Sequence, residues 1–265
     1  MNATATRPIG DLLREWRQRR RLSQLDFAVE AEISSKHLSF METGRSRPSR
    51  EMLLRLTDLL EVPLRERNTL LIAAGFAPMF TERKLDDPSL QAARDAMEMV
   101  LKGHEPYPAV AIDRHWTLLA ANRAVAPMLT GISAKLLEPP MNVLRLSLHP
   151  DGLAPRIVNL GQWRAHLLAR LRRQIEVSAD TVLIALLEEL SSYPAPQPPA
   201  RSADMDGVNA FVVPMRLATP AGVLSFISTT TVFGTPIDVT LSELALESFF
   251  PADAATAAAL RQMPL

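Results

Sequence analysis

Apolar positions recur at helical spacing through the first 75 residues, which predicts a series of short amphipathic helices. The first carries Ile9, Leu12, Leu13 and Trp16 and ends in a basic run at Arg17 to Arg21. The same period predicts helices over residues 23–30, 34–42, 49–62 and 64–74. Ser23, Ser34 and Ser49 precede three of them, and a serine hydroxyl there accepts a hydrogen bond from a free backbone N–H. Residues 1–80 are therefore expected to form an all-α five-helix domain.

The pattern changes after residue 85. Apolar residues along one stripe of residues 86–102 predict a helix, and we assign residues 81–105 to a connecting segment. Apolar runs at residues 109–112 and 117–121 flank the polar group Asp113-Arg114-His115, which predicts two strands joined by a tight turn. A second strand pair is predicted at residues 211–217 and 223–233, with helices over residues 160–175 and 181–190 between the pairs. Residues 106–265 therefore predict an α+β domain.

Composition limits the class of protein. The 265 residues are 47% hydrophobic and 22% charged, as in a folded globular chain, and contain no cysteine. Disulfides, thiolate zinc sites and cysteine nucleophiles are thus excluded. No apolar run approaches the roughly 18 residues that a membrane span requires, and the first residues do not resemble a secretory signal. We expect a cytoplasmic protein that does not contact a membrane.

Charge is divided unevenly along the chain. Basic and acidic side chains both total 29, yet residues 1–75 hold 13 basic and 10 acidic ones, a net charge of +3, which leaves −3 for the rest. The predicted helix at 160–175 carries four arginines: Arg164, Arg170, Arg172 and Arg173. We interpret them as a solvated surface. The alternative is a second contact with DNA or with an acidic partner.

The residue pattern does not indicate an enzyme. The acidic pairs are adjacent in sequence and splay apart, the five histidines lack metal-binding i, i+4 spacing, and there is no glycine-rich phosphate loop. We therefore predict no catalytic residue, no metal site and no cofactor.

The helices at 23–30 and 34–42 are separated by only three residues, a connection typical of a helix-turn-helix. In that motif the second helix lies in the major groove and its N-terminal residues meet the base edges. Ser34 and Ser35 begin this helix; Lys36 can donate to guanine, and Phe40 can rest on a thymine methyl group. His37 is open between a DNA contact and a partly buried residue that braces the helix.

Residues on either side of this helix are candidates for phosphate binding. Gln24 stands at the start of the preceding helix, and Arg45, Arg47 and Arg50 follow the recognition helix. Phosphate contacts fix the position of a protein on DNA without reading its sequence. The alternative is that these arginines only solvate a loop.

The segments Leu22-Ser-Gln24, Ile33-Ser34 and Leu38 to Arg45 resemble the XRE-type helix-turn-helix of lambdoid phage repressors. Glu32 is a departure, because that family often has glycine there in a left-handed turn. A non-glycine residue in that conformation costs about 1 kcal/mol.

The remaining sequence resembles XRE-type regulators that carry a C-terminal MmyB-like, PAS-like ligand-binding domain. The resemblance rests on segments throughout the chain: Arg65 to Asn68, Ala73 to Pro78, Tyr107 to Val110, Asn142 to Leu146, His149 to Leu153, Thr230 to Pro236, Asp238 to Leu241 and Glu247 to Asp253. It implies a double-stranded DNA operator as partner and, for some members, a fatty-acid-like or other apolar ligand. Trp116, Asn122, Arg145 and Phe226 are the candidate ligand-binding residues.

The candidate ligand-binding residues also have purely structural interpretations. Arg145 lies in an apolar stretch, where a guanidinium needs a carboxylate from a ligand or, the reading we favour, from the protein. Trp116 and Phe226 can equally be core residues. The sequence thus predicts a DNA-binding regulator whose C-terminal domain senses a small apolar molecule and supports a homodimer. The alternative is a ligand-free module for dimerisation or protein interaction.

Overall fold

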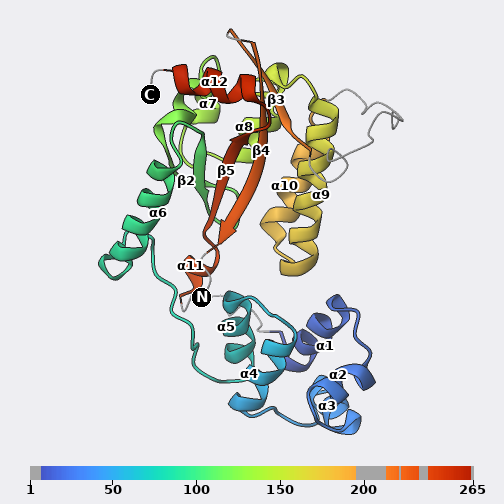
Figure 1. Ribbon diagram of the computed structural model, residues 1–265. Helices are drawn as coiled ribbons and strands as arrows, with labels where there is room; N and C mark the ends of the chain where they lie inside the picture. The colour runs from blue at the N-terminus through green and yellow to red at the C-terminus, as the bar shows by residue number, and fades with distance from the viewer. Residues whose placement is uncertain (1–6, 195–212, 221, 233–237, 264–265) are drawn as a thin grey trace. The chain divides into compact units, whose positions relative to one another are not determined.

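The computed structural model describes residues 7–194, 213–220, 222–232 and 238–263, and the chain divides into two units (Figure 1). The first unit comprises residues 1–84 with short segments at 176–178 and 235–242, and the second comprises the rest. The expected strand residues 211, 212 and 233 lie outside the described residues.

The first unit contains the five predicted helices. They are α1 (Ile9–Arg19), α2 (Gln24–Glu30), α3 (Ser35–Glu42), α4 (Arg50–Leu59) and α5 (Leu64–Ala73). The hydroxyls of Ser23, Ser34 and Ser49 accept the backbone N–H groups three residues later, which confirms the predicted caps. The Asp26 carboxylate in addition accepts from the Ser23 hydroxyl at 2.6 Å.

The turn between α2 and α3 is intact although it lacks glycine. Glu32 has φ +51°, the left-handed conformation expected at this position. Its N–H donates to Val29 O at 3.0 Å, and the Ile33 N–H donates to Ala28 O at 2.9 Å, so these carbonyls at the end of α2 are hydrogen-bonded.

Gly10 lies where α1 contacts the end of α3. A Cβ on Gly10 would lie 2.6 Å from the carbonyl oxygens of Met41 and Glu42. Only glycine lets α1 approach the end of α3 so closely.

A buried ion pair joins the first three helices. Glu42, whose side chain is fully buried, accepts from Arg17 Nε at 2.6 Å and Nη2 at 3.0 Å. Gln24 Nε2 adds a third hydrogen bond at 2.7 Å. Burial raises the pKa of Glu42, but the hydrogen bonds from Arg17 and Gln24 outweigh it and hold the pKa below its usual value.

The second unit is built on one antiparallel sheet of order β2-β1-β5-β4-β3. Its strands are β1 (Ala109–Ile112), β2 (Leu118–Ala121), β3 (Met215–Thr219), β4 (Gly222–Val232) and β5 (Ala245–Pro251). Helices and short 3-10 turns surround the sheet: η1 (Pro88–Leu90), α6 (Gln91–Gly103), η2 (Arg123–Leu129), α7 (Ala134–Leu137), α8 (Val143–Leu148), η3 (Ala154–Arg156), α9 (Leu160–Ser178), α10 (Thr181–Ser192) and α12 (Ala254–Gln262). The short helix α11 (Val239–Ser242) belongs to the first unit. The α+β class is thus confirmed, with β5 as a central strand that the apolar pattern did not predict.

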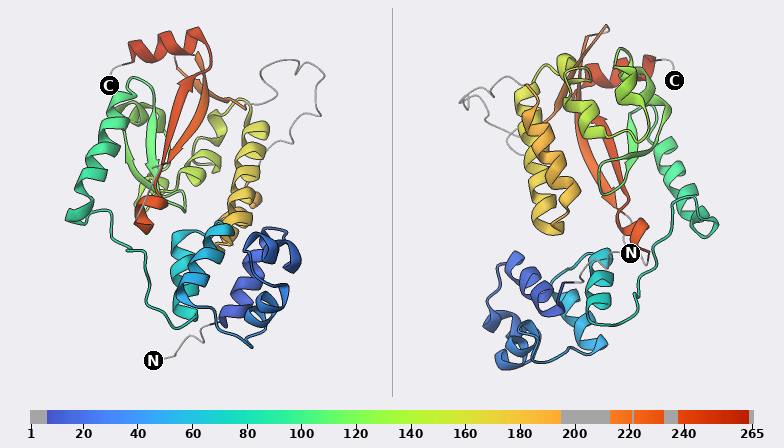
Figure 2. Two further views of the ribbon diagram at one scale, coloured as in Figure 1. Left: turned by 60° about the horizontal axis from the view of Figure 1, so that its bottom comes forward. Right: turned by 180° about the vertical axis from the view of Figure 1, so that it is seen from behind.

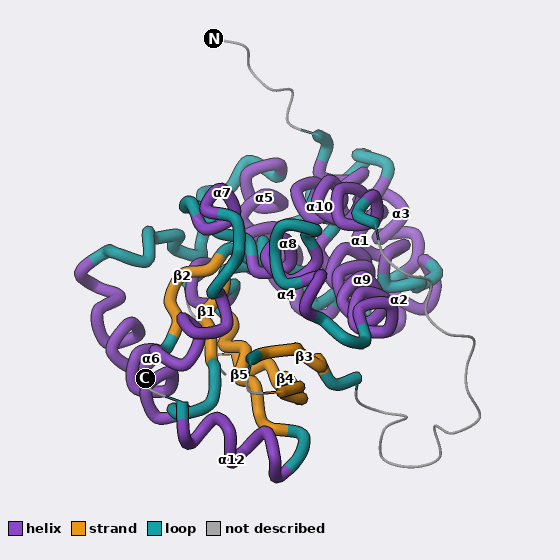
Figure 3. The backbone as a smooth tube through the Cα atoms, turned by 90° about the horizontal axis from the view of Figure 1, so that it is seen from above, coloured by secondary structure: helices purple, strands orange, loops and turns teal. Residues whose placement is uncertain are grey.

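Alternate residues of the strands supply two cores. Ala109 and Ala111 face α6 and pack with Met97 and Leu101. Val110 and Ile112 face the opposite way, into a larger core with residues of α8, α9 and α10. Figures 2 and 3 show α6 and α9 on opposite faces of the strands. The helix predicted at residues 86–102 therefore packs on the sheet that follows it in sequence.

The buried pair in the first unit generates a prediction. Glu42→Ala leaves the Arg17 guanidinium buried without its anion, so the first unit should lose about 3–5 kcal/mol of stability. Because the folded pKa of Glu42 lies below its ordinary value of 4.5, the stabilisation is present above that pH and is lost as the pH falls through the folded pKa. Native-state hydrogen exchange of the amides in α2 and α3 measures both effects.

Glu32→Ala is the matched control. Its carboxylate pairs with Arg55 at 2.7 Å, but its side chain is 81% exposed, and pairs of that kind contribute about 0.5 kcal/mol or less. Equal losses in the two variants would contradict the role assigned to Glu42.

Candidate functional site

The first turn of α3 presents three exposed side chains: Ser35, Lys36 and His37. The exposure of His37 favours the reading as a DNA contact over that as a buried brace. Lys36 Nζ lies 5.7 Å from the centre of the half-buried Phe40 ring, and Arg45 Cζ lies 5.6 Å from it. Two cations thus flank one aromatic ring on the outer surface of the predicted recognition helix.

The predicted phosphate contacts fall into two groups. Arg45, Arg47 and Arg50 are exposed after α3, and none of them forms an ion pair with another described residue. Gln24 is different, because its amide donates to the buried Glu42 carboxylate. Ser34 likewise accepts from the His37 N–H as the cap of α3. The structure therefore places Gln24 and Ser34 in contacts that position α3, and leaves the arginines exposed to solvent.

A cavity of about 120 Å³ lies on the face of the sheet opposite α6. Trp116 and Phe226, both predicted, contribute to its wall, and both are about 95% buried or more. The other lining residues are Pro108, Val110, Leu118, Val125, Met128, Leu129, Val143, Leu144, Leu146, Ser147, Leu153, Trp163, Leu167, Arg170, Met215, Leu217, Ser228, Glu247 and Phe249. Cavities with such a wall bind apolar molecules that a few polar groups orient.

Sequence reasoning missed the charged residues of this cavity. The sequence pattern assigns Arg170 to a solvated face, but in the structure Arg170 lines the cavity and pairs with Glu247 on β5. The signal was present, because Arg170 follows Leu167 by three residues and Trp163 by seven and so shares their side of the helix. Glu247 gave no comparable signal, since β5 was not predicted. The other three arginines of this helix, Arg164, Arg172 and Arg173, do not line the cavity. Arg164 donates to the carbonyl of Ser191 at 2.7 Å.

Two predicted ligand contacts serve the fold instead. The Asn122 side chain accepts from Ala109 N–H and donates to the carbonyls of Leu101 and Tyr107, which joins the end of α6 to β1. Arg145 makes two hydrogen bonds of 2.7 Å to the Glu189 carboxylate, the internal pair that we favoured from the sequence. Neither residue lines the cavity.

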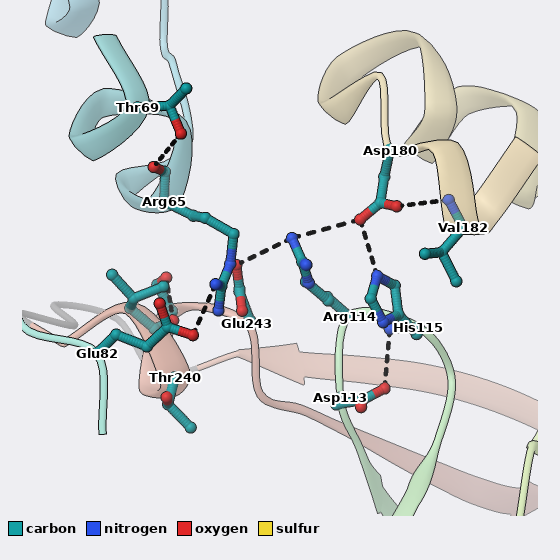
Figure 4. A network of polar contacts seen from close by, with 12 residues as sticks. Arg65, Thr69, Glu82, Asp113, Arg114, His115, Asp180, Val182, Thr240 and Glu243 are labelled. Atoms are coloured by element: carbon teal, nitrogen blue, oxygen red, sulfur yellow. Dashed lines mark hydrogen bonds and ion pairs between the residues drawn. The ribbon is translucent and has the colours of Figure 1, made fainter. Parts of the chain in front are cut away.

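A second polar network fixes the turn between β1 and β2. Asp180 caps α10 through the Val182 N–H, contacts His115 Nε2 at 2.8 Å and pairs with Arg114 (Figure 4). Burial opposes ionisation of Asp180, but the hydrogen bonds from His115 and Val182 lower the pKa of its carboxyl below the usual value. The network ties the strand turn, which carries Trp116, to the start of α10.

Comparison with known families agrees with this arrangement. Residues 8–70 match a helix-turn-helix domain, and residues 93–263 match the ligand-binding domain of MmyB-like transcription regulators. The chain belongs to the MmyB-like transcription regulators. No curated protein matches it.

The regulator therefore combines a DNA-binding domain with a domain that takes a small-molecule ligand. Both families are regulatory and not enzymatic. The described residues contain no cluster of three or more His, Asp or Glu side chains suited to a metal ion. They also contain no helix with the length and hydrophobicity of a membrane span.

The cavity makes a direct prediction. Benzene at about ten times its Kd should raise the melting temperature of the second unit by about 3 °C, because a ligand that binds only the folded state stabilises it. Differential scanning calorimetry with and without benzene measures this shift.

Leu167→Trp fills the cavity and should abolish the shift, whereas Ile184→Trp, at a site that is 40% exposed, should retain it. A shift of the same size in both variants would mean that benzene binds elsewhere.

Proposed function

We propose that the regulator reads an operator with α3 and alters its DNA affinity when a small apolar molecule enters the cavity of the second unit. The observation that carries the proposal is that cavity, an apolar space that the described core side chains of the second unit leave unfilled. The alternative of a ligand-free interaction module predicts a filled core at this position.

The DNA half of the proposal rests on the surface of α3. Its first turn exposes Lys36 and Ser35, the positions from which a recognition helix meets base edges. A lysine donates to guanine O6 and N7, and the flanking arginines suit phosphate oxygens. The first 75 residues carry the positive net charge that attraction to DNA requires.

The ligand half rests on the size and polarity of the cavity. An engineered apolar cavity of about 150 Å³ in another protein binds benzene, so 120 Å³ suits a single ring or a short alkyl chain. The fatty-acid-like compounds that the resemblance implies fit only at the short end of their range, unless lining side chains move.

Dimerisation completes the proposal. One recognition helix covers only a few base pairs, and helix-turn-helix proteins gain affinity and length of site by pairing on half-sites about 34 Å apart. Met99 and Val100 on α6 are exposed apolar side chains of the second unit, and we propose that they contribute to its self-association.

Operator binding should depend on Lys36. Lys36→Ala removes a base contact and should weaken specific binding by about 1–3 kcal/mol, with little effect on random DNA. Fluorescence anisotropy on an operator selected from random DNA, and on a scrambled duplex, measures both affinities.

Arg47→Ala is the matched comparison. Loss of a phosphate contact should weaken both duplexes equally and reduce the salt slope by about one. If Lys36→Ala left the specific affinity unchanged, α3 would not be the reading helix.

The oligomeric state has its own test. We expect light scattering to give two chains of 29.3 kDa per particle, both for the free protein and, after the mass of the DNA is subtracted, on the operator. Met99→Asp should shift the free protein towards monomer, because it places a charge on the proposed contact surface, whereas Met79→Asp, at another exposed methionine, should not. A monomer in both states of the wild-type chain would remove dimerisation from the proposal.

A further inference from the structure

The charged groups that line the cavity are paired with each other. Arg170 and Glu247 are the charged residues among the described residues that line it, and they come from α9 and the central strand β5. Glu247 is only 4% exposed, whereas its cross-strand neighbour Thr230 is exposed. The Arg170 side chain is 23% exposed, so the pair borders both the apolar space and solvent.

The positive charge of Arg170 is already paired with a carboxylate of the protein. Its guanidinium pairs with Glu247 Oε1, donates to Thr230 Oγ1 at 2.6 Å and stacks over Trp116, with Cζ 4.5 Å from the ring. The Thr230 hydroxyl in turn donates to Glu247 Oε1 at 2.7 Å. The cation thus has both an anion and an aromatic face as partners within the protein.

The two carboxylate oxygens of Glu247 differ in their hydrogen-bond partners. Oε1 takes both bonds from Arg170 and Thr230, and no described residue donates a hydrogen bond to Oε2. Strand register puts Val110 and Thr230 directly opposite Glu247, and Ser228 opposite Phe249, on the same side of the sheet. Glu247 and Ser228 therefore line the same mainly apolar space, whose other polar lining residues are Ser147 and Arg170.

We propose that the cavity selects small apolar alcohols and amines over carboxylates, and that Glu247 is the residue that determines this specificity. The inference rests on the proposed ligand-sensing function. A hydroxyl or ammonium group donates to Oε2 and leaves the pair between Arg170 and Glu247 unchanged, while its short alkyl chain or ring fills the apolar space.

A ligand carboxylate meets a penalty in either of two positions. Beside Glu247 it places two like charges close together in a partly dehydrated site. If it binds Arg170 instead, it takes the cation from Glu247 and leaves a buried carboxylate without its partner. Both routes weaken acids relative to donors of the same chain length.

The test is calorimetric titration of the full chain at pH 7.5 with three six-carbon probes: hexan-1-ol, hexylamine and hexanoate. We expect the alcohol and the amine to bind at least about tenfold more tightly than the acid. Hexanoate binding as tightly as hexan-1-ol would overturn the inference and leave the proposed ligand-sensing function standing. If none of the three bound, the ligand-sensing function itself would fail.

Glu247→Gln sharpens the test, because it removes the negative charge and keeps an acceptor for Arg170 and Thr230. Hexanoate affinity should rise about tenfold relative to that of hexan-1-ol, whose hydroxyl accepts from the new amide N–H instead of donating to Oε2. Glu188→Gln is the control for net charge, since Glu188 is exposed on α10 and does not line the cavity. An unchanged hexanoate affinity in folded Glu247→Gln would overturn the role of Glu247; if the variant did not fold, the wild-type series would decide.

Discussion

A carboxylate that is removed from water needs a cation beside it, and this constraint organises both units of the regulator. In the first unit Glu42 is fully buried, and Arg17 and Gln24 reach it from α1 and α2. The recognition helix α3 is thereby held against its two neighbours. In the second unit Glu247 lies at the centre of the sheet, and Arg170 reaches it from α9. The same electrostatic requirement thus positions the predicted recognition helix in one unit and two residues of the cavity wall in the other.

The buried pair also gives a reason for the cavity. A side chain that filled the space beside Glu247 with apolar atoms would cover its second oxygen without offering a hydrogen-bond donor, and such coverage costs free energy. The apolar wall that includes Phe226 and Leu167 shares the cavity with the pair. Under the proposed specificity, a small molecule with a donor group would contact both the apolar wall and the carboxylate oxygen.

Sequence reasoning succeeded where a signal is local. Helical spacing and the serine caps predicted the first unit because a cap depends on residues three positions apart. It failed at β5, because Glu247 and Ser248 interrupt an apolar run that only a central strand explains. It also misplaced Arg170, since charge suggested a solvated face although the helical position pointed inward. The roles of Asn122 and Arg145 depend on partners distant in sequence, Leu101 and Glu189, which no local pattern identifies.

The central claim is that ligand binding in the cavity and operator binding are linked by one coupling free energy, which is the same in both directions. The most direct measurement is a thermodynamic cycle: operator affinity with and without a saturating cavity ligand, and ligand affinity with and without saturating operator. The account predicts that both ratios equal the same factor, within the range of about 5-fold to 150-fold that is typical of coupled sites. Operator affinity that stayed the same at saturating ligand, for a compound that calorimetry shows to bind the cavity, would contradict it.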